Sequence, residues 1–208
     1  MKREAENNVH PAHQERSRDK RDRLIRAGLS VFARCGYHQT RMTDVAAEAG
    51  VSVGVLYQRF KDKRAFFEVI VDTLAERLEQ GVNDFFEAAD DAWSLHELVA
   101  RVIETLVEVV ERDVGFFLAL VTVGDDVPGA ISRIAATDRL RARRFHAFAI
   151  RGGLIDRAVD EETVFFALAT AIRMLLVTAT VDRDPVRLRN PETRSQLAAM
   201  LTGYLQRG

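Results

Sequence analysis

The residues best suited to chemistry lie between Thr43 and Arg64, in the stretch TDVAAEAGVSVGVLYQRFKDKR. Thr43 and Ser52 can each cap the start of a short helix, where unpaired backbone N–H groups attract anions. Tyr57 adds a hydroxyl beside these helix starts. The bases that follow are Arg59, Lys61, Lys63 and Arg64. Hydroxyl and cationic groups beside helix starts bind phosphate, so the stretch predicts polyanion binding rather than catalysis.

The positive charge of the chain is concentrated around this stretch. Net charge is −1 over 208 residues, yet the segment from Arg16 to Arg64 holds twelve Lys and Arg against five Asp and Glu. The segment from Ala65 to Gly208 has the opposite excess, with 16 bases against 23 acids. A basic segment on an acidic remainder indicates a polyanionic partner for the first part, although a solvated charged face gives the same count.

A first helix precedes the phosphate-binding residues. Residues 1–17 are polar, contain a proline and show no apolar period, which predicts a mobile tail. From about Asp19 apolar residues recur at helical spacing, and Gly36 is the expected end of this helix.

Short helices then position the groups that could bind phosphate. One runs from Thr43 to Gly50, where glycine can adopt the left-handed conformation that ends a helix. The next begins at Ser52 and extends to about Phe60, and Asp62 caps a long fourth helix.

Two short helices joined by a glycine-containing turn constitute a helix-turn-helix unit, whose second helix enters the major groove of DNA. A helical hairpin inside a larger bundle would explain the apolar residues of these helices equally well. It would not explain the bases or the shortness of the helices. Double-stranded DNA is therefore the predicted partner.

The stretch TRMTDVAAEAGVSVGVLYQRFKDKRAFF resembles the DNA-binding signature of the TetR family of bacterial transcriptional repressors. The shared features are a Thr-capped helix, an Ala-Gly-Val-Ser turn, a Gly-x-Leu-Tyr-x-x-Phe recognition helix and the Lys that follows. The resemblance covers about Arg21 to Phe67. It implies a homodimer whose C-terminal domain binds a small molecule that releases DNA.

The resemblance also implies roles for individual residues. Those that correspond to phosphate contacts are Thr43, Ser52, Tyr57 and Lys63. Those that would face the groove are Val53, Gly54 and Val55. Val55 departs from the Thr that the family often has, so a thymine methyl is the expected contact there. Arg59 is a further candidate for a phosphate or base contact, whereas Leu56 and Phe60 are expected to pack inside.

The remainder of the chain keeps a helical pattern, which predicts an all-α protein with nine or so helices. A three-helix helix-turn-helix domain is expected at residues 18–64, and a helical ligand-binding and dimerisation domain at residues 65–208. The expected later helices are Leu95–Arg112, one opening at Pro128, Asp138–Arg151, Glu161 to about Val181, and Pro191 to about Gln206.

One recognition helix reads too few bases for useful specificity, so we expect a homodimer on a palindromic operator. The last two helices are the expected interface because each has a broad apolar face. These faces comprise Phe165, Leu168, Ile172, Leu175, Leu176 and Ala179 on one helix, and Leu197, Met200, Leu201 and Tyr204 on the other.

Aromatic residues are more frequent in the C-terminal region than a bundle of this length usually requires, which predicts a largely apolar pocket for a small-molecule effector. Its expected lining includes Leu106, Phe117, His146, Phe166, Thr170 and Arg173. Arg173 needs a partner if buried, either across an interface or on an acidic ligand. The same aromatic residues would also suit an ordinary core, and His146 a surface position.

No enzyme, metal or cofactor is predicted. The sequence has no Glu-x-x-His pair, no Cys or His cluster and no Gly-rich phosphate loop, and Cys35 is expected in the core. The longest apolar run is too short to cross a bilayer and the N-terminus has no signal-peptide pattern, so a cytoplasmic protein without a membrane partner is expected. The alternative function is an all-helical protein-interaction module that has lost DNA reading.

Overall fold

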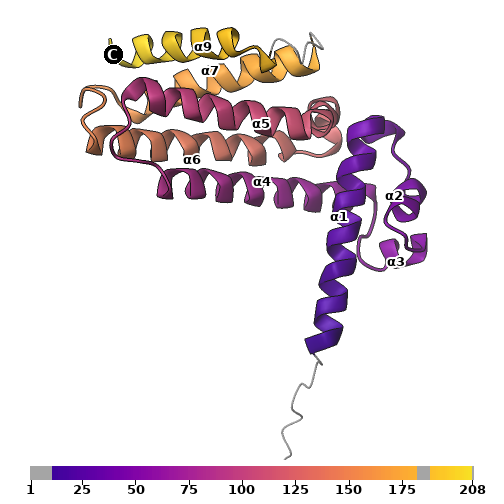
Figure 1. The fold of residues 1–208 in the computed structure, drawn as a ribbon. Coiled ribbons are helices and arrows are strands. Elements are labelled where there is room, and N and C mark those ends of the chain that lie inside the picture. The colour runs from indigo at the N-terminus through magenta and orange to yellow at the C-terminus, as the bar shows by residue number, and fades with distance from the viewer. Residues whose placement is uncertain (1–10, 182–187, 208) are drawn as a thin grey trace, which may run out of the picture.

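The computed structural model describes residues 11–181 and 188–207, and within these ranges it contains helices and no strand (Figure 1). The predicted all-α class is confirmed. Helices α4 to α9 lie side by side in a layered bundle, and α1 crosses one end of it with α2 and α3 beside it. The chain therefore has a small head at one end of a larger helical body.

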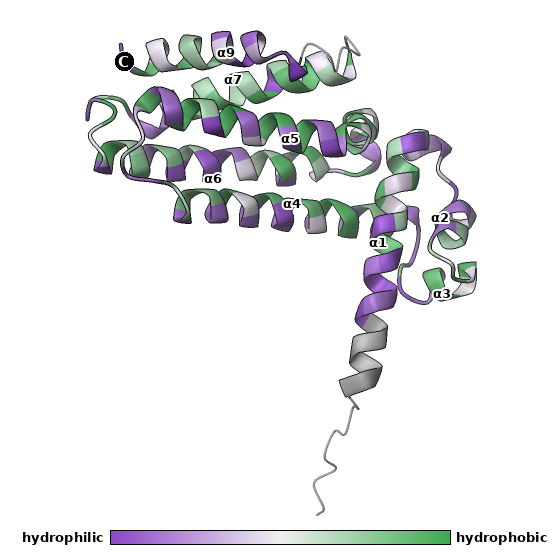
Figure 2. Ribbon diagram, viewed as in Figure 1, coloured by the Kyte–Doolittle hydropathy of each residue, from purple (hydrophilic) through white to green (hydrophobic). Residues whose placement is uncertain are grey.

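Helix α1 (Pro11–Gln39) begins eight residues before Asp19, so residues 11–17 are helical and do not belong to the expected tail. Proline suits the first turn of a helix, because the N–H that it lacks has no partner there. Figure 2 shows that the first coloured turns of α1 are strongly hydrophilic. Gly36 departs from helical geometry, with φ 73°, and the last residues of α1 follow a kink. Residues 1–10 lie outside the described residues.

The head is completed by α2 (Met42–Glu48) and α3 (Val53–Tyr57). Its core centres on Phe32, which meets Phe67 edge to face at a centroid distance of 4.9 Å. Leu56 and Phe60 are both buried in this core, as expected. The head is therefore held by aromatic packing between α1, the start of α4 and Phe60, which follows the recognition helix.

The body consists of α4 (Lys63–Glu87), α5 (Leu95–Thr122), α6 (Ala130–Arg151), α7 (Glu161–Thr180) and α9 (Pro191–Leu205). The predicted caps at Asp62, Asp160 and Asn190 are present, and each side chain accepts a backbone N–H of its first turn. Between α5 and α7 the sequence predicted two helices, but α6 is a single one. Asp138 was expected to begin a helix, yet it lies inside α6 and pairs with Arg141.

The chain has two apolar cores, and the core of the head extends well past residue 64. The core of the head continues into the end of α5 through Phe116, Phe117 and Leu120. At the crossing of α1 and α5, a Cβ placed on Gly115 would lie 2.6 Å from the carbonyl oxygen of Ala33. Only glycine permits this approach, so α5 physically joins the head to the body.

Helix α7 is apolar enough and long enough to cross a membrane, with a mean hydropathy of 1.8. The sequence-based prediction considered only uninterrupted apolar runs, whereas threonines and Arg173 interrupt the apolar residues of α7. Length and composition are the only support for a membrane span. Of the apolar window, 44% is buried inside the bundle.

Candidate DNA interface and effector cavity

The helix-turn-helix geometry begins with the turn between α2 and α3. Gly50 has φ 66°, as expected for the residue that ends α2. Ser52 caps α3 by accepting the N–H of Val55 at 3.4 Å, which confirms its predicted local role. Thr43 does not cap α2, because the helix begins one residue earlier and Arg41 occupies the capping position without a side-chain bond. Thr43 remains exposed in the first turn of α2.

The outer side of α3 is available to a partner. Val53 is 37% exposed and Tyr57 is 51% exposed, and Gly54 lies between them on the surface. Val55 is half-buried, and Arg59 is exposed just beyond the end of the helix. The inner side of α3 packs through Leu56. The groove-facing and phosphate-binding residues predicted for α3 are therefore exposed, apart from the half-buried Val55.

Helix α2 is braced against α1 by a residue pair that sequence reasoning missed. Arg34 donates to Glu48 at 2.7 Å, and this bond holds the pKa of the Glu48 carboxyl below its usual value. Arg41, also missed, is exposed at the start of α2.

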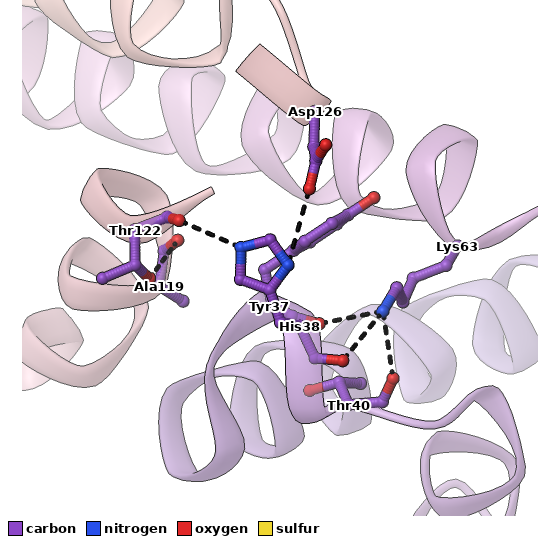
Figure 3. Close-up of polar contacts among 7 residues, drawn as sticks. All are labelled: Tyr37, His38, Thr40, Lys63, Ala119, Thr122 and Asp126. Atoms are coloured by element: carbon purple, nitrogen blue, oxygen red, sulfur yellow. Dashed lines mark hydrogen bonds and ion pairs between the residues drawn. The ribbon is translucent and has the colours of Figure 1, made fainter. Parts of the chain in front are cut away.

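Lys63 occupies a different environment from the one expected. Its ammonium donates to the carbonyl oxygens of Tyr37 at 3.0 Å, His38 at 3.3 Å and Thr40 at 3.4 Å (Figure 3). It also lies 4.6 Å from the centroid of the Tyr37 ring. In this structure Lys63 caps the end of α1 rather than presenting a free cation, because carbonyl groups at a helix C-terminus attract positive charge.

Replacing Lys63 by Met should lower the free energy of unfolding by about 1–3 kcal/mol, because carbonyl groups at the end of α1 lose a charged donor. Urea unfolding would measure this loss, with the exposed Lys61→Met as the matched control. The slope of DNA affinity against salt should be unchanged. A stable variant with a smaller salt slope would instead restore the phosphate role first predicted for Lys63.

His38 joins the head to the end of α5. One ring nitrogen lies 3.2 Å from the carbonyl oxygen of Thr122, and the other lies 3.5 Å from the carboxylate of Asp126 in the short 3-10 turn Gly124–Asp126 (Figure 3). Both neighbours are acceptors, so the complete arrangement requires a proton on each nitrogen. This contact lies beside the Lys63 cap and ties the same end of α1 to the body.

Two cavities lie inside the body, with volumes of about 440 and 200 Å³. The larger is bounded by α4, α5 and Arg141 of α6, and the smaller by α4, α5, α6 and α7. They share Leu78, Leu106, Val109 and Arg141 as wall residues. Together they fall within the range of about 300–1,000 Å³ that small-molecule sites usually occupy.

Three of the predicted pocket residues line these cavities. Leu106 lines both, and Phe117 and Arg173 line the smaller one. The others point elsewhere because they lie on different faces of their helices. The ring of His146 contacts the carbonyl oxygen of Val159 at 2.9 Å, and Phe166 and Thr170 are exposed on the outer side of α7. None of these three lines either cavity, and Thr170 instead lines a separate hollow with Arg173 and Met174.

An ion pair missed by sequence reasoning lies at the junction of the cavities. Arg141 is 8% exposed and donates to Asp138 at 2.8 Å. Burial raises the pKa of the Asp138 carboxyl against the opposing effect of Arg141 and Arg173, and burial lowers the pKa of the Arg141 guanidinium. The sequence contained a signal for the burial of Arg141, because helical spacing places it on the same side of the helix as Phe145 and Phe148.

Exposed apolar side chains of α7 and α9 form a surface that we name the outer apolar face. It consists of Phe166, Met174, Val177, Met200 and Tyr204, all exposed. The rings of Phe166 and Tyr204 lie 6.1 Å apart, which joins the two helices into one surface. Half of the residues predicted for the dimer face, including Leu168 and Leu201, are instead buried within the chain. The periodicity identified apolar helices but not which side faces outward.

No group of three or more His, Cys, Asp or Glu in the described part of the chain is placed to hold a metal ion. Cys35 is exposed rather than in the core, because it lies on the outer side of α1 near the kink at Gly36.

An exposed recognition helix on a small helical head, joined to a larger helical body with internal cavities, defines a helix-turn-helix transcriptional regulator. The chain matches the family described as bacterial regulatory proteins, tetR family, over residues 24–70, and the tetracyclin repressor-like C-terminal domain over residues 94–205. The chain therefore belongs to the tetR family.

Named relatives are regulators of transcription or metabolism. The "HTH-type transcriptional activator FasR" of Mycolicibacterium smegmatis is 28% identical over 95 residues, which cover 46% of this chain and 42% of that protein. The "Fatty acid metabolism regulator protein" of Bacillus subtilis is 30% identical over 86 residues, or 41% of this chain and 43% of that protein. The chain spans less than half the length of these curated relatives.

Among solved structures, the transcriptional regulator FadR from Bacillus subtilis, determined in complex with stearoyl-CoA, has a TM-score of 0.62. It is 18% identical, and the match covers 88% of this chain and 96% of that chain. At this identity the likeness shows a shared fold.

Proposed function

We propose that this regulator is a repressor that binds a palindromic operator as a homodimer in the cytoplasm and is released by a largely apolar small molecule. The observation that supports this most directly is the position of Phe117. This residue belongs to the core that holds the head, and it also lines the smaller cavity in the body. A molecule in that cavity would press on the packing that orients the recognition helix.

The DNA-binding surface in this proposal is the outer side of α3 with the start of α2. Ser52, Tyr57 and Thr43 would bind phosphates, with Arg59 as a further phosphate or base contact. Val53, Gly54 and Val55 would face the bases of the major groove. Support comes from the exposure of most of these side chains on one side of the head and from the basic charge of this segment.

Tyr57→Phe should weaken operator binding by about 5- to 100-fold, because the dimer would lose one hydrogen bond in each half-site at about 0.5–1.5 kcal/mol each. Binding to random DNA should weaken by a similar factor, since a phosphate contact carries no sequence information. Fluorescence anisotropy would measure both affinities. Tyr204→Phe removes the same hydroxyl far from the head and should leave both unchanged. Salt-independent binding by the wild type would favour the protein-interaction alternative.

The proposed effector has a hydrocarbon chain. The smaller cavity is lined mainly by apolar side chains, including Phe117, Leu120, Ile134, Ile172 and Leu176. The relatives named for fatty acid metabolism and the neighbour solved with stearoyl-CoA agree with an acyl compound. Such a ligand would release DNA by favouring the conformation in which the two recognition helices are wrongly spaced, and DNA would weaken the ligand in return.

Release can be tested by filling the cavities. Val109 lines both of them from α5, so Val109→Trp should occupy the space of the ligand. We expect the variant to bind operator normally and to require at least about tenfold more acyl compound for release, the cost of about 1.4 kcal/mol of binding. Glu104→Trp places the same ring on the exposed side of α5 and should behave as the wild type. Unchanged release by the Val109 variant would place the effector elsewhere.

A further inference from the structure

Arg141 is a buried cation that faces both cavities. It lies in α6, is 8% exposed, and contributes to the wall of each cavity where the two share residues. Among the described residues its polar partner is Asp138, through one guanidinium nitrogen at 2.8 Å. A guanidinium has five N–H donors, so this single bond leaves donors available to a bound molecule.

The charges around the smaller cavity leave one positive charge without a counter-charge in its wall. Its wall contains Arg141, Arg173 and Asp138 as charged residues. The arginines of the larger cavity differ, because Arg77 and Arg112 both bind the buried carboxylate of Asp113, at 2.7 and 3.0 Å. A single anionic group would therefore balance this wall, and Arg141 is the buried one of its two arginines, since Arg173 is exposed.

The ion pair between Arg141 and Asp138 is shielded from water. Burial raises the pKa of Asp138 and lowers the pKa of Arg141, so each charge is disfavoured by its surroundings despite the other. Buried ion pairs contribute little net stability when desolvation offsets their attraction. If the carboxylate of a bound molecule replaced that of Asp138 as the partner of Arg141, the protein would therefore lose little stability.

We propose that Arg141 is the receptor for the carboxylate of an amphipathic effector, and that Asp138 holds the same place in the ligand-free protein. The hydrocarbon chain then extends from Arg141 into the smaller cavity toward Phe117. The displaced carboxylate of Asp138 turns to Arg173, whose charge already acts on it. This inference rests on the proposed function, and it identifies the effector as a monocarboxylate instead of a neutral or thioester-linked chain.

The test compares ligands that share a chain and differ in the head group. Decanoate, 1-decanol and decanoyl-CoA would be titrated into the full-length protein by calorimetry, with operator release measured in parallel. The wild type should bind decanoate at least tenfold more tightly than 1-decanol. Arg141→Gln should abolish that preference while leaving 1-decanol affinity unchanged, and Arg141→Lys should restore part of it.

Asp138→Asn provides the second variant, because it keeps the size of the side chain and removes the competing charge. We expect it to fold and to bind decanoate at least threefold more tightly than the wild type does. Circular dichroism would confirm the helical content of each variant.

The outcomes separate this inference from the proposed function. If decanoate and 1-decanol bind and release operator equally, and the variants do not change their ratio, Arg141 is not a head-group receptor but the apolar effector stands. If decanoyl-CoA alone binds and is insensitive to both variants, the carboxylate assignment is wrong. If no acyl compound binds while operator affinity is intact, both the effector proposal and this inference fail.

Discussion

Val177→Asp is expected to convert a homodimer into a monomer of 23.4 kDa at micromolar concentration. Val177 is 49% exposed on the outer apolar face, which also carries Phe166 at 60% and Met200 at 57%. A two-fold interface contains every substitution twice, so the variant dimer would contain two added carboxylates. Both would lose their hydration on entering an apolar interface, which disfavours the dimer. Because one half-site alone binds weakly, operator affinity should fall by about 100-fold or more, or about 2.7 kcal/mol.

Analytical ultracentrifugation and operator titration would measure these two effects on the same samples. The control is Leu118→Asp, which places the same charge on another exposed apolar residue, in α5. Its dimer should remain intact. Leu201→Glu is not a suitable test of the interface, because Leu201 is buried within the chain and its replacement should unfold the protein. Persistence of a Val177→Asp dimer would show that the chains pair elsewhere.

Gly115→Ala is expected to destabilise the protein by about 1–3 kcal/mol, the usual cost of inserting atoms into a closely packed contact. The added methyl carbon would lie 2.6 Å from the carbonyl oxygen of Ala33 and 2.8 Å from its Cβ. These atoms belong to the backbone and the shortest of side chains, so neither can rotate away. Helix α1 must then move relative to α5, which displaces the head.

Urea unfolding would measure the stability of this variant, and anisotropy its affinity for operator. Gly81→Ala is the matched control, since a Cβ there meets no atom within 4 Å. Alanine should stabilise α4 by about 0.5–1 kcal/mol because glycine is the poorer helix former. If Gly115→Ala were as stable as wild type and bound operator equally well, the crossing would not orient the head.

Within the head, local sequence was sufficient for most of the structure. The turn at Gly50, the cap at Ser52 and the burial of Leu56 all depend on residues close together in the chain. Such interactions follow from side-chain chemistry and helical period, which a sequence displays directly. The start of α2 is the exception, since the neighbouring threonine was taken for its cap.

Lys63 shows where local reasoning failed. The motif around it suggested a free cation, yet its partners lie at Tyr37, His38 and Thr40, more than twenty positions away in the chain. The end of α1 needed a donor for its carbonyl groups, and only the folded arrangement of α1 and α4 brings this ammonium to them.

The sequence by itself determined the helical class, the helix-turn-helix unit and its exposed recognition face, because these depend on periodicity and on contacts within a few residues. Only the tertiary structure decided which side of α7 faces outward, and that Phe166 and Thr170 lie outside the cavities lined by Leu106 and Phe117. Both sides of α7 are apolar, so hydropathy cannot separate a core face from an exposed one. That distinction depends on how α5, α6 and α9 pack around the helix.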